Sequence, residues 1–306
     1  MKTKIVYALV SDGNGFYFEK AYLSAWSVRH YNPNAHITLI LDNKTRQVLD
    51  AETYTNFIKL VDEEIVVPFN DNSTNTEKSR WLKTKLRELV KGDFLFLDVD
   101  TIACSDLSDI DNTIGSIGFT WDFNCLFSEN PSRYYYAKLM RRYFNQDINF
   151  DGYYFNSGVC YAKDDVKAYD FFSTWHENWL HTRNQGYLRD QLSLLKTTSD
   201  LSSYVNEISG SYNCQISTNL RYLHDAKIIH FYKMGSDFNF SPFLGNDIYL
   251  ELRNSKKVTD QISDKILNCK SIFYGPVKIV GGNDFCFMES RIYQILKRFY
   301  LYYKQL

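Results

Sequence analysis

Apolar residues in the first hundred positions of the chain fall into two alternating patterns. Four runs are short and nearly continuous, which is typical of buried strands, and they occupy residues 4–10, 36–42, 64–69 and 94–98. Two longer segments carry apolar residues at helical spacing and end at an Asn-Pro-Asn breaker or a glycine, residues 16–31 and 79–92. Strands and helices that alternate in short units predict an α/β sheet, mostly parallel, with helices on both faces.

The middle of the chain continues this pattern. Residues 166–180 have the amphipathic spacing of a helix. The strand candidates around this helix are residues 116–123, 155–163 and 226–231. We therefore expect the sheet to extend through the middle of the chain.

The pattern changes at about residue 240, where no linker-like composition intervenes. From there the sequence predicts helices joined by a loop at residues 274–282. We therefore expect a main domain over residues 1–239 and a helical C-terminal region over residues 240–306.

Composition excludes several classes of protein. The 306 residues carry a formal net charge of -1, which gives no reason to expect binding to nucleic acid. The six cysteines include no Cys-x-x-Cys pair, so we expect reduced thiols and a cytoplasmic protein. The apolar run near the N-terminus is too short for a signal peptide, and we expect no segment that crosses a bilayer.

The strand at residues 94–98 runs directly into a pair of carboxylates, Asp98 and Asp100. Side chains in a strand alternate, so both should point the same way. Two like charges roughly 6 Å apart repel by about 3 kcal/mol at an effective dielectric near 20. A raised pKa on one carboxyl group, or a hard divalent cation between the two, would relieve this repulsion.

Two other interpretations of this Asp-Val-Asp segment remain. In the first, the two aspartates simply cap a turn. In the second, the segment opens a phosphatase of the haloacid-dehalogenase type, in which the first aspartate is a nucleophile. That pattern favours Thr or Val two residues past the second aspartate, where this chain has Ile102, and the segment lies behind two strand–helix units.

The order of several segments resembles a known family. These segments are KIVYALVSD, AYLSAWSVRHYNP, SRWLKTKLREL, FLFLDVDTI, FNSGV, DQ and IIHF, and the resemblance covers roughly residues 4–235. In this order they resemble the GT-A-fold glycosyltransferases that use nucleotide sugars. They are most similar to the retaining group, family 8-like, that includes glycogenin and bacterial lipopolysaccharide galactosyltransferases.

The resemblance implies a metal site and a set of donor contacts. Asp98 and Asp100 match the family's metal-binding Asp-x-Asp, and His230 matches the third ligand, a mixed set that suits Mn²⁺ better than Mg²⁺. Asp190 and Gln191 match the pair beside the anomeric carbon, which implies catalytic roles. The implied contacts to the nucleotide and donor sugar are Val10, Ser11, Tyr17, Arg80, Lys83, Asp98, Val99, Asp122, Asn156, Ser157, Asn213 and Lys233.

The resemblance also has a departure. The family follows its histidine with a glycine and a Lys-Pro-Trp ending, whereas here Lys233 comes early and Pro-Trp is absent. The function it implies is transfer of a sugar from a nucleotide donor, with UDP as the expected nucleotide, to a saccharide or lipid-linked saccharide, with retention. The alternatives are the phosphatase described above and a non-catalytic binding protein with a transferase fold.

Residues 290–306 mix four basic residues with aromatic and aliphatic ones and contain no acid. A helix of this composition suits the headgroup region of an anionic membrane. The alternative is a terminal helix that packs on the domain with its basic residues solvated. The sequence thus predicts a cytoplasmic protein that attaches peripherally to the inner face of a membrane.

Overall fold

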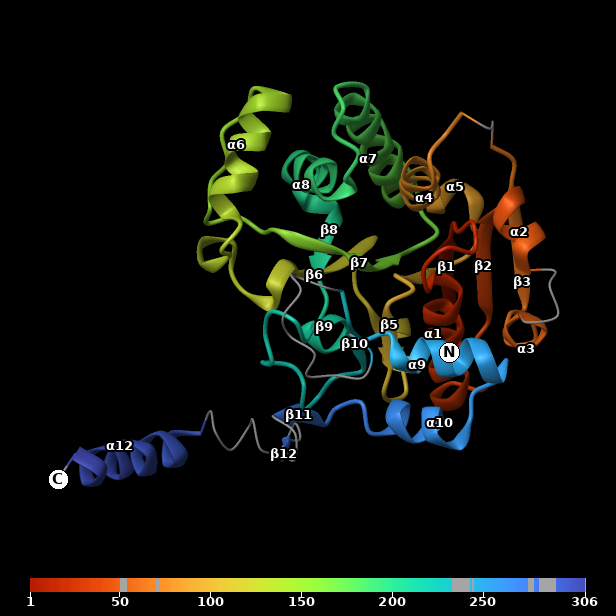
Figure 1. The fold of residues 1–306 in the computed structure, drawn as a ribbon. Helices are drawn as coiled ribbons and strands as arrows, with labels where there is room; N and C mark the ends of the chain where they lie inside the picture. The colour runs from red at the N-terminus through yellow and green to blue at the C-terminus, as the bar shows by residue number, and fades with distance from the viewer. Residues whose placement is uncertain are drawn as a thin grey trace.

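A seven-stranded sheet forms the centre of the molecule, with the strand order β3-β2-β1-β4-β7-β6-β8 (Figure 1). Its strands are β1 (Lys4–Leu9), β2 (Ile37–Asp42), β3 (Glu63–Val67), β4 (Phe94–Leu97), β6 (Ile117–Trp121), β7 (Phe155–Ala162) and β8 (Val205–Glu207). Only β7 runs against the others, so the predicted, mostly parallel sheet is confirmed. The computed structural model describes residues 1–49, 54–69, 72–232, 243, 245–274, 278–280 and 290–305.

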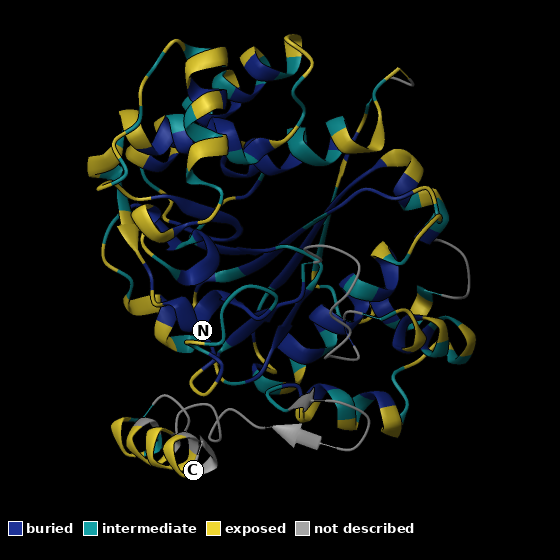
Figure 2. Ribbon diagram, turned by 60° about the vertical axis from the view of Figure 1, so that its left-hand side comes forward, coloured by how far each residue is buried: buried dark blue, intermediate teal, exposed yellow. Residues whose placement is uncertain are grey.

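The central strands are mostly buried (Figure 2), and their alternating side chains belong to two separate cores, one on each face of the sheet. Ile5, Tyr7 and Leu9 of β1 pack in the core that contains α1 (Tyr17–Tyr31). Val6 packs in the opposite core, under α4 (Asn75–Thr84), α5 (Leu86–Leu89) and α7 (Val166–Asn184). Helices therefore cover both faces, as the sequence predicts.

The segment expected to form one helix over residues 79–92 forms two. The helix α4 (Asn75–Thr84) starts earlier than expected because Thr74 and Glu77 form a capping box. It ends at Lys85, whose φ of -104° and ψ of 7° leave the helical region, and α5 (Leu86–Leu89) follows. The early start brings the first residues of α4 toward the carboxyl end of the sheet.

The chain after β4 leaves the main sheet and builds a second one. Here β5 (Thr101–Ala103), β10 (Ile228–His230) and β9 (Cys214–Gln215) form a three-stranded sheet in the order β5-β10-β9. The sequence placed the strand at 226–231 in the main sheet, and this expectation is wrong. The separate small sheet matters for the site, because β10 pairs antiparallel with β5 and sets His230 opposite Thr101.

The C-terminal region contributes helices to the main core. Apolar residues of α9 (Asp247–Ser255) and α10 (Asp260–Leu267) lie in the same core as α1. Where the sequence predicts a loop, β11 (Ile272–Tyr274) and β12 (Lys278–Val280) pair antiparallel. The division between residues 239 and 240 stays a prediction.

Several short elements complete the described fold. The helices not mentioned so far are α2 (Asn43–Leu49), α3 (Thr55–Ile58), α6 (Arg133–Phe144), α8 (Asp190–Asp200) and α12 (Arg291–Gln305). None of the helices in the described part combines the length and the apolar character that crossing a bilayer requires.

Candidate metal and donor site

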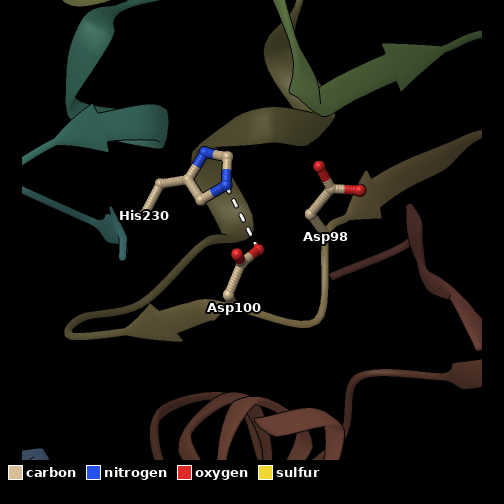
Figure 3. A group of neighbouring side chains, drawn as sticks. All are labelled: Asp98, Asp100 and His230. Carbon is tan, nitrogen blue, oxygen red and sulfur yellow. Dashed lines mark ion pairs between the residues drawn. The ribbon is translucent and has the colours of Figure 1, made fainter. Parts of the chain in front are cut away.

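Asp98, Asp100 and His230 converge at the carboxyl end of β4 (Figure 3). Their potential ligand atoms all lie within 4.8 Å of one another, and His230 Nε2 is 3.3 Å from an oxygen of Asp100. Two carboxylates and one imidazole at such distances can share a divalent cation. The resemblance groups these three residues as metal ligands, and the fold brings them together although 130 positions separate Asp100 from His230.

Backbone hydrogen bonds fix the turn that carries the two aspartates. The amide of Asp98 donates to the carbonyl of Gly158 at 2.7 Å, and the amide of Phe231 donates to the carbonyl of Asp100 at 2.8 Å. The hydroxyl of Thr101 donates to the carbonyl of Asp98 at 2.8 Å. The turn is therefore tied to β7 on one side and to the end of β10 on the other.

Gly158 is a site residue that the sequence reasoning missed. A Cβ atom built at this position would overlap the imidazole ring of His230 and also lie 3.0 Å from Oδ1 of Asn156. Because only glycine leaves this space, Gly158 lets β7 pass directly beside the histidine. The signal was present in the segment FNSGV, where the glycine interrupts an otherwise well-filled strand.

A chain of amide contacts sets the tautomer of His230. Asn156 accepts the amide of Gly158 at its Oδ1, 2.9 Å away, and donates from Nδ2 to Asp122 at 2.9 Å. Asn213 then donates to the same Oδ1 of Asn156, so its own oxygen faces Nδ1 of His230 at 3.0 Å. That oxygen can only accept, which puts the ring proton on Nδ1 and leaves the lone pair of Nε2 toward Asp100.

The two aspartates differ in their protonation behaviour. Burial raises the pKa of Asp98, and the positive charge of Lys83 offsets this only in part. Burial also opposes ionisation of Asp100, but a His230 ring that is protonated on Nε2 as well donates a hydrogen bond to this carboxylate, which outweighs burial and holds the pKa of Asp100 below its usual range. The repulsion expected from the sequence is thus relieved by unequal environments for the two carboxyl groups.

Behind the aspartates lies a buried network of alternating charges. The ammonium group of Lys83 contacts both carboxylate oxygens of Asp98, at 3.0 and 3.1 Å, and lies 3.5 Å from Asp190. Arg80 pairs with the other oxygen of Asp190 at 2.9 Å. Burial would raise the pKa of Asp190, but Arg80 and then Lys83 hold it below its usual range. The charges of Arg80 and Lys83 are therefore already matched by carboxylates.

A cavity of about 290 Å³ opens in front of the aspartates, between the ends of β1 and β4. In sheets of this kind ligands bind where neighbouring strands connect in opposite directions, as β1 and β4 do here. Of the predicted site residues, those that line it are Val10, Ser11, Tyr17, Arg80, Asp98, Val99 and Asp100. Asp12 and Asn14, in the loop that the resemblance assigns to the nucleotide base, also line it. Residues that the sequence reasoning missed line it as well, namely Ala8, Leu9, Lys20, Asn75, Thr76 and Ser79.

Hydrogen bonds and an ion pair connect two segments that line this cavity, the loop after β1 and the start of α4. The amide of Ser11 donates to the hydroxyl of Thr45 at 2.9 Å, and Thr45 returns a hydrogen bond to the carbonyl of Ser11 at 3.1 Å. Thr45 in turn contacts Asp42, which forms a buried ion pair of 2.7 Å with Lys78 of α4. The loop after β1 and the start of α4 are thus joined through the end of β2.

The other predicted residues that the structure describes are not among those that line the cavity. Both carboxylate oxygens of Asp122 accept amide hydrogen bonds, from Asn156 and Asn130, and burial raises the pKa of Asp122 to about 6. Gln191 accepts the amide of Ser157 at 3.3 Å and donates to the carbonyl of Phe155. Lys233 lies outside the described residues.

Two residues of α9, in the C-terminal region, contact the loop after β1 and the start of α1. Arg253 of α9 forms an ion pair of 2.6 Å with the buried Glu19 and donates to the carbonyl of Gly15. Its guanidinium group lies over the ring of Phe16, 4.7 Å from the centroid, and Tyr249 stacks on the same ring at 5.6 Å. Residues 15–19, which lead into α1, are therefore held from the far end of the chain.

Comparison with solved structures places this architecture in a known class. The chain has the GT-A fold of nucleotide-sugar glycosyltransferases, which confirms the fold that the resemblance implies. A complex of the galactosyltransferase LgtC with donor and acceptor sugar analogs matches 86% of this chain and 100% of its own, at 17% identity and a TM-score of 0.53. Mouse xyloside xylosyltransferase 1 matches 75% of this chain and 97% of its own, at 12% identity and a TM-score of 0.51.

These matches establish the fold alone, because the sequences have diverged so far. An active-site mutant of LgtC, in which glutamate replaces a glutamine, matches with a TM-score of 0.53 at 16% identity. No protein-family model and no curated protein sequence matches the chain. The arrangement of the site itself therefore carries the functional argument.

Proposed function

We propose that the chain is a metal-dependent glycosyltransferase. It transfers a sugar from a nucleotide donor, with UDP as the expected nucleotide, to a saccharide or lipid-linked saccharide acceptor. The observation that carries this proposal is the convergence of Asp98, Asp100 and His230 at the mouth of a cavity between β1 and β4. The GT-A fold supports it, because the matching structures include a galactosyltransferase and a xylosyltransferase.

The donor atoms of the site fit a divalent cation. Asp98 and Asp100 offer oxygens, and the tautomer of His230 offers the lone pair of Nε2. This mixed set suits Mn²⁺ better than Mg²⁺, which prefers oxygen ligands alone. When bound, such an ion acts as a Lewis acid toward the phosphate oxygens of the leaving group.

Different residues of the site bind different parts of the nucleotide-sugar donor. The end of β1 at Val10 and Ser11 borders the edge of the base, and the exposed ring of Tyr17 stacks on the base. Lys83 and Arg80 hold Asp190 in its charged form, so Asp190 accepts hydrogen bonds from hydroxyl groups of the donor sugar. Asn156 and Asn213 act on the same region by keeping the histidine and the cavity wall in place.

Retention of the anomeric configuration is proposed from the resemblance alone, and the weak nucleophile Gln191 then disfavours a covalent intermediate. Gln191 has an amide rather than a carboxylate, and both ends of that amide are bound to backbone groups of β7. We therefore assign attack by the acceptor to the face from which the diphosphate leaves, with a phosphate oxygen taking the acceptor proton. The glutamine-to-glutamate variant of LgtC, described as an active-site mutant, supports an active-site role for an amide in this fold.

One screen tests the proposed function. We expect Mn²⁺ together with UDP to raise the melting temperature, and at least one UDP-sugar to be hydrolysed slowly when no acceptor is present. NMR of the anomeric proton of a transfer product then reads the configuration. Hydrolysis of simple phosphate monoesters without nucleotide preference would favour the phosphatase, and binding of UDP without any hydrolysis or transfer would favour a binding protein.

We also propose that α12 attaches the protein peripherally to the inner face of an anionic membrane. Its apolar residues recur at helical spacing and are exposed, among them Ile292, Ile295, Leu296, Phe299 and Tyr303. Phe299 is 69% exposed and Ile292 is 67% exposed, which is unusual for large apolar side chains on a helix of a single protein domain. Four basic residues and no acid in this segment complement anionic headgroups.

Sedimentation with liposomes tests this attachment. We expect the full chain to pellet with vesicles that contain anionic lipid and to stay in solution with neutral vesicles. A chain that ends at residue 289 keeps α9 and α10 and should stay in solution with both. Reversal of Arg291 and Arg298 to glutamate in the full chain should weaken membrane binding by at least about thirtyfold, since each basic residue contributes about 1 kcal/mol and the two together about 2 kcal/mol. Equal pelleting of full and shortened chains would contradict the attachment.

A further inference from the structure

The cavity between the ends of β1 and β4, here called the donor cavity, is lined by charged side chains, and not all of them have an ion-pair partner among the described residues. Its lining includes the carboxylates of Asp12, Asp98 and Asp100 and the cations Lys20 and Arg80. Arg80 is paired with Asp190 at 2.9 Å. Lys20, in contrast, forms no side-chain hydrogen bond or ion pair with any residue in the described part of the chain. It is therefore a cation that faces the cavity with its binding capacity unused.

Two aromatic rings position the ammonium group of Lys20 but accept no hydrogen bond from it. Its Nζ lies 6.0 Å from the ring centroid of Tyr17 and 5.8 Å from that of Tyr249. Aromatic faces attract a cation, but they offer no oxygen that could accept its three N–H groups. Tyr249 is itself fixed, because its hydroxyl donates to the carbonyl of Phe243 at 2.7 Å. The side chain is thus positioned for a ligand that brings its own acceptor atoms.

The position of Lys20 on its helix points to an anionic ligand. Lys20 lies in the first turn of α1, where the helix dipole disfavours a positive charge and favours a bound anion. Lys20 also lines the same cavity as the metal-site carboxylates Asp98 and Asp100. A ligand between Lys20 and the aspartates must therefore be an anion that can also contact a cation held by those aspartates.

We propose that Lys20 binds the diphosphate group of the nucleotide donor. This inference rests on the proposed function and goes beyond it, because the resemblance assigns that role to Lys233, at the other end of the chain. The ammonium group donates hydrogen bonds to phosphate oxygens on the side of the diphosphate that faces α1. Tyr17 and Tyr249 keep the ammonium group in place, so α9 takes part in binding the diphosphate.

Binding measurements on matched variants test the role of Lys20. Lys20→Met keeps the length of the side chain and removes the charge, and Lys20→Arg keeps the charge. Lys91→Met is the control, because Lys91 is exposed and does not line the cavity. The readouts are titration calorimetry with UDP in the presence of Mn²⁺ and ligand-observed NMR with uridine, which has the same base and sugar and no phosphate.

We expect Lys20→Met to weaken UDP binding by about ten- to hundredfold, the range for a charge-assisted hydrogen bond, and to leave uridine binding unchanged. Lys20→Arg should recover most of the UDP affinity, and Lys91→Met should bind as the wild type does. Unchanged UDP binding in Lys20→Met, or an equal loss for UDP and uridine, would overturn the role of Lys20 alone. A wild-type protein that does not bind UDP would overturn the proposed function and this inference with it.

Discussion

Replacement of Asp100 by asparagine should reduce metal-dependent hydrolysis of the donor by about a thousandfold. The variant keeps the size of the side chain and removes one of the two charged oxygen ligands. Loss of the Lewis acid is expected to cost about 4 kcal/mol of transition-state stabilisation, which corresponds to three factors of ten in rate. Initial rates with UDP-sugar over a range of Mn²⁺ concentrations, together with calorimetric titration of Mn²⁺, measure the effect.

Asp151→Asn is the matched control for this experiment. Asp151 is an exposed aspartate that is not part of the metal group or the donor cavity, so its replacement should leave rate and metal affinity unchanged. The wild-type rate should also fall to the level of Asp100→Asn when the metal is removed with a chelator. A rate for Asp100→Asn within tenfold of the wild type would show that Asp100 is not a metal ligand that the reaction needs.

Replacement of Gly158 by alanine should weaken metal binding although it changes no proposed ligand. The added methyl group would occupy the space of the His230 imidazole, so the ring must turn away from Asp100 or β7 must shift. We expect Mn²⁺ affinity to fall by at least the 10- to 100-fold typical of changes beside a metal ligand. The free energy of unfolding should fall by about 1–3 kcal/mol, as for other overpacked sites.

Gly152→Ala separates this local effect from a general cost of replacing glycine. A Cβ at Gly152 would lie 3.4 Å from the carbonyl of Asn149, which is ordinary contact, and the position is exposed. Metal titration and thermal unfolding should give wild-type values for this variant. If Gly158→Ala bound Mn²⁺ with wild-type affinity, His230 would not be the nitrogen ligand that the geometry indicates.

The sequence predicts most strands of the main sheet and the Asp-x-Asp turn well because the pattern of each is local, whereas β8 was missed and β10 belongs to the small sheet. Continuous apolar runs identify β1, β2 and β4 with ends that differ from the prediction by one residue, since each strand is buried on both faces. The break at Lys85 was missed because helical periodicity continues through it. The capping box at Thr74 was readable as Thr-x-x-Glu, but it lies outside the apolar pattern that guided the assignment.

The site was only partly predictable, for reasons of distance along the chain. His230 was proposed through the resemblance, because no local pattern links it to residues 98–100; the link is the register between β5 and β10. Lys20 was missed because, within an apolar helix, one lysine has the pattern of an ordinary surface residue. Gly158 was missed because the need for glycine comes from a ring that packs against it from another strand.

The contact of Arg253 with Glu19 and Gly15 has a consequence for how the protein is made. Chains begin to fold from the N-terminus while they are being synthesised. The parallel strands can assemble early, but the loop beside the cavity gains its anchor only after α9 has been synthesised. The donor cavity is therefore among the last parts of the molecule to reach its final structure. A prematurely terminated chain that lacks α9 would keep most of its sheet, but the loop beside its cavity would lack the contacts of Arg253.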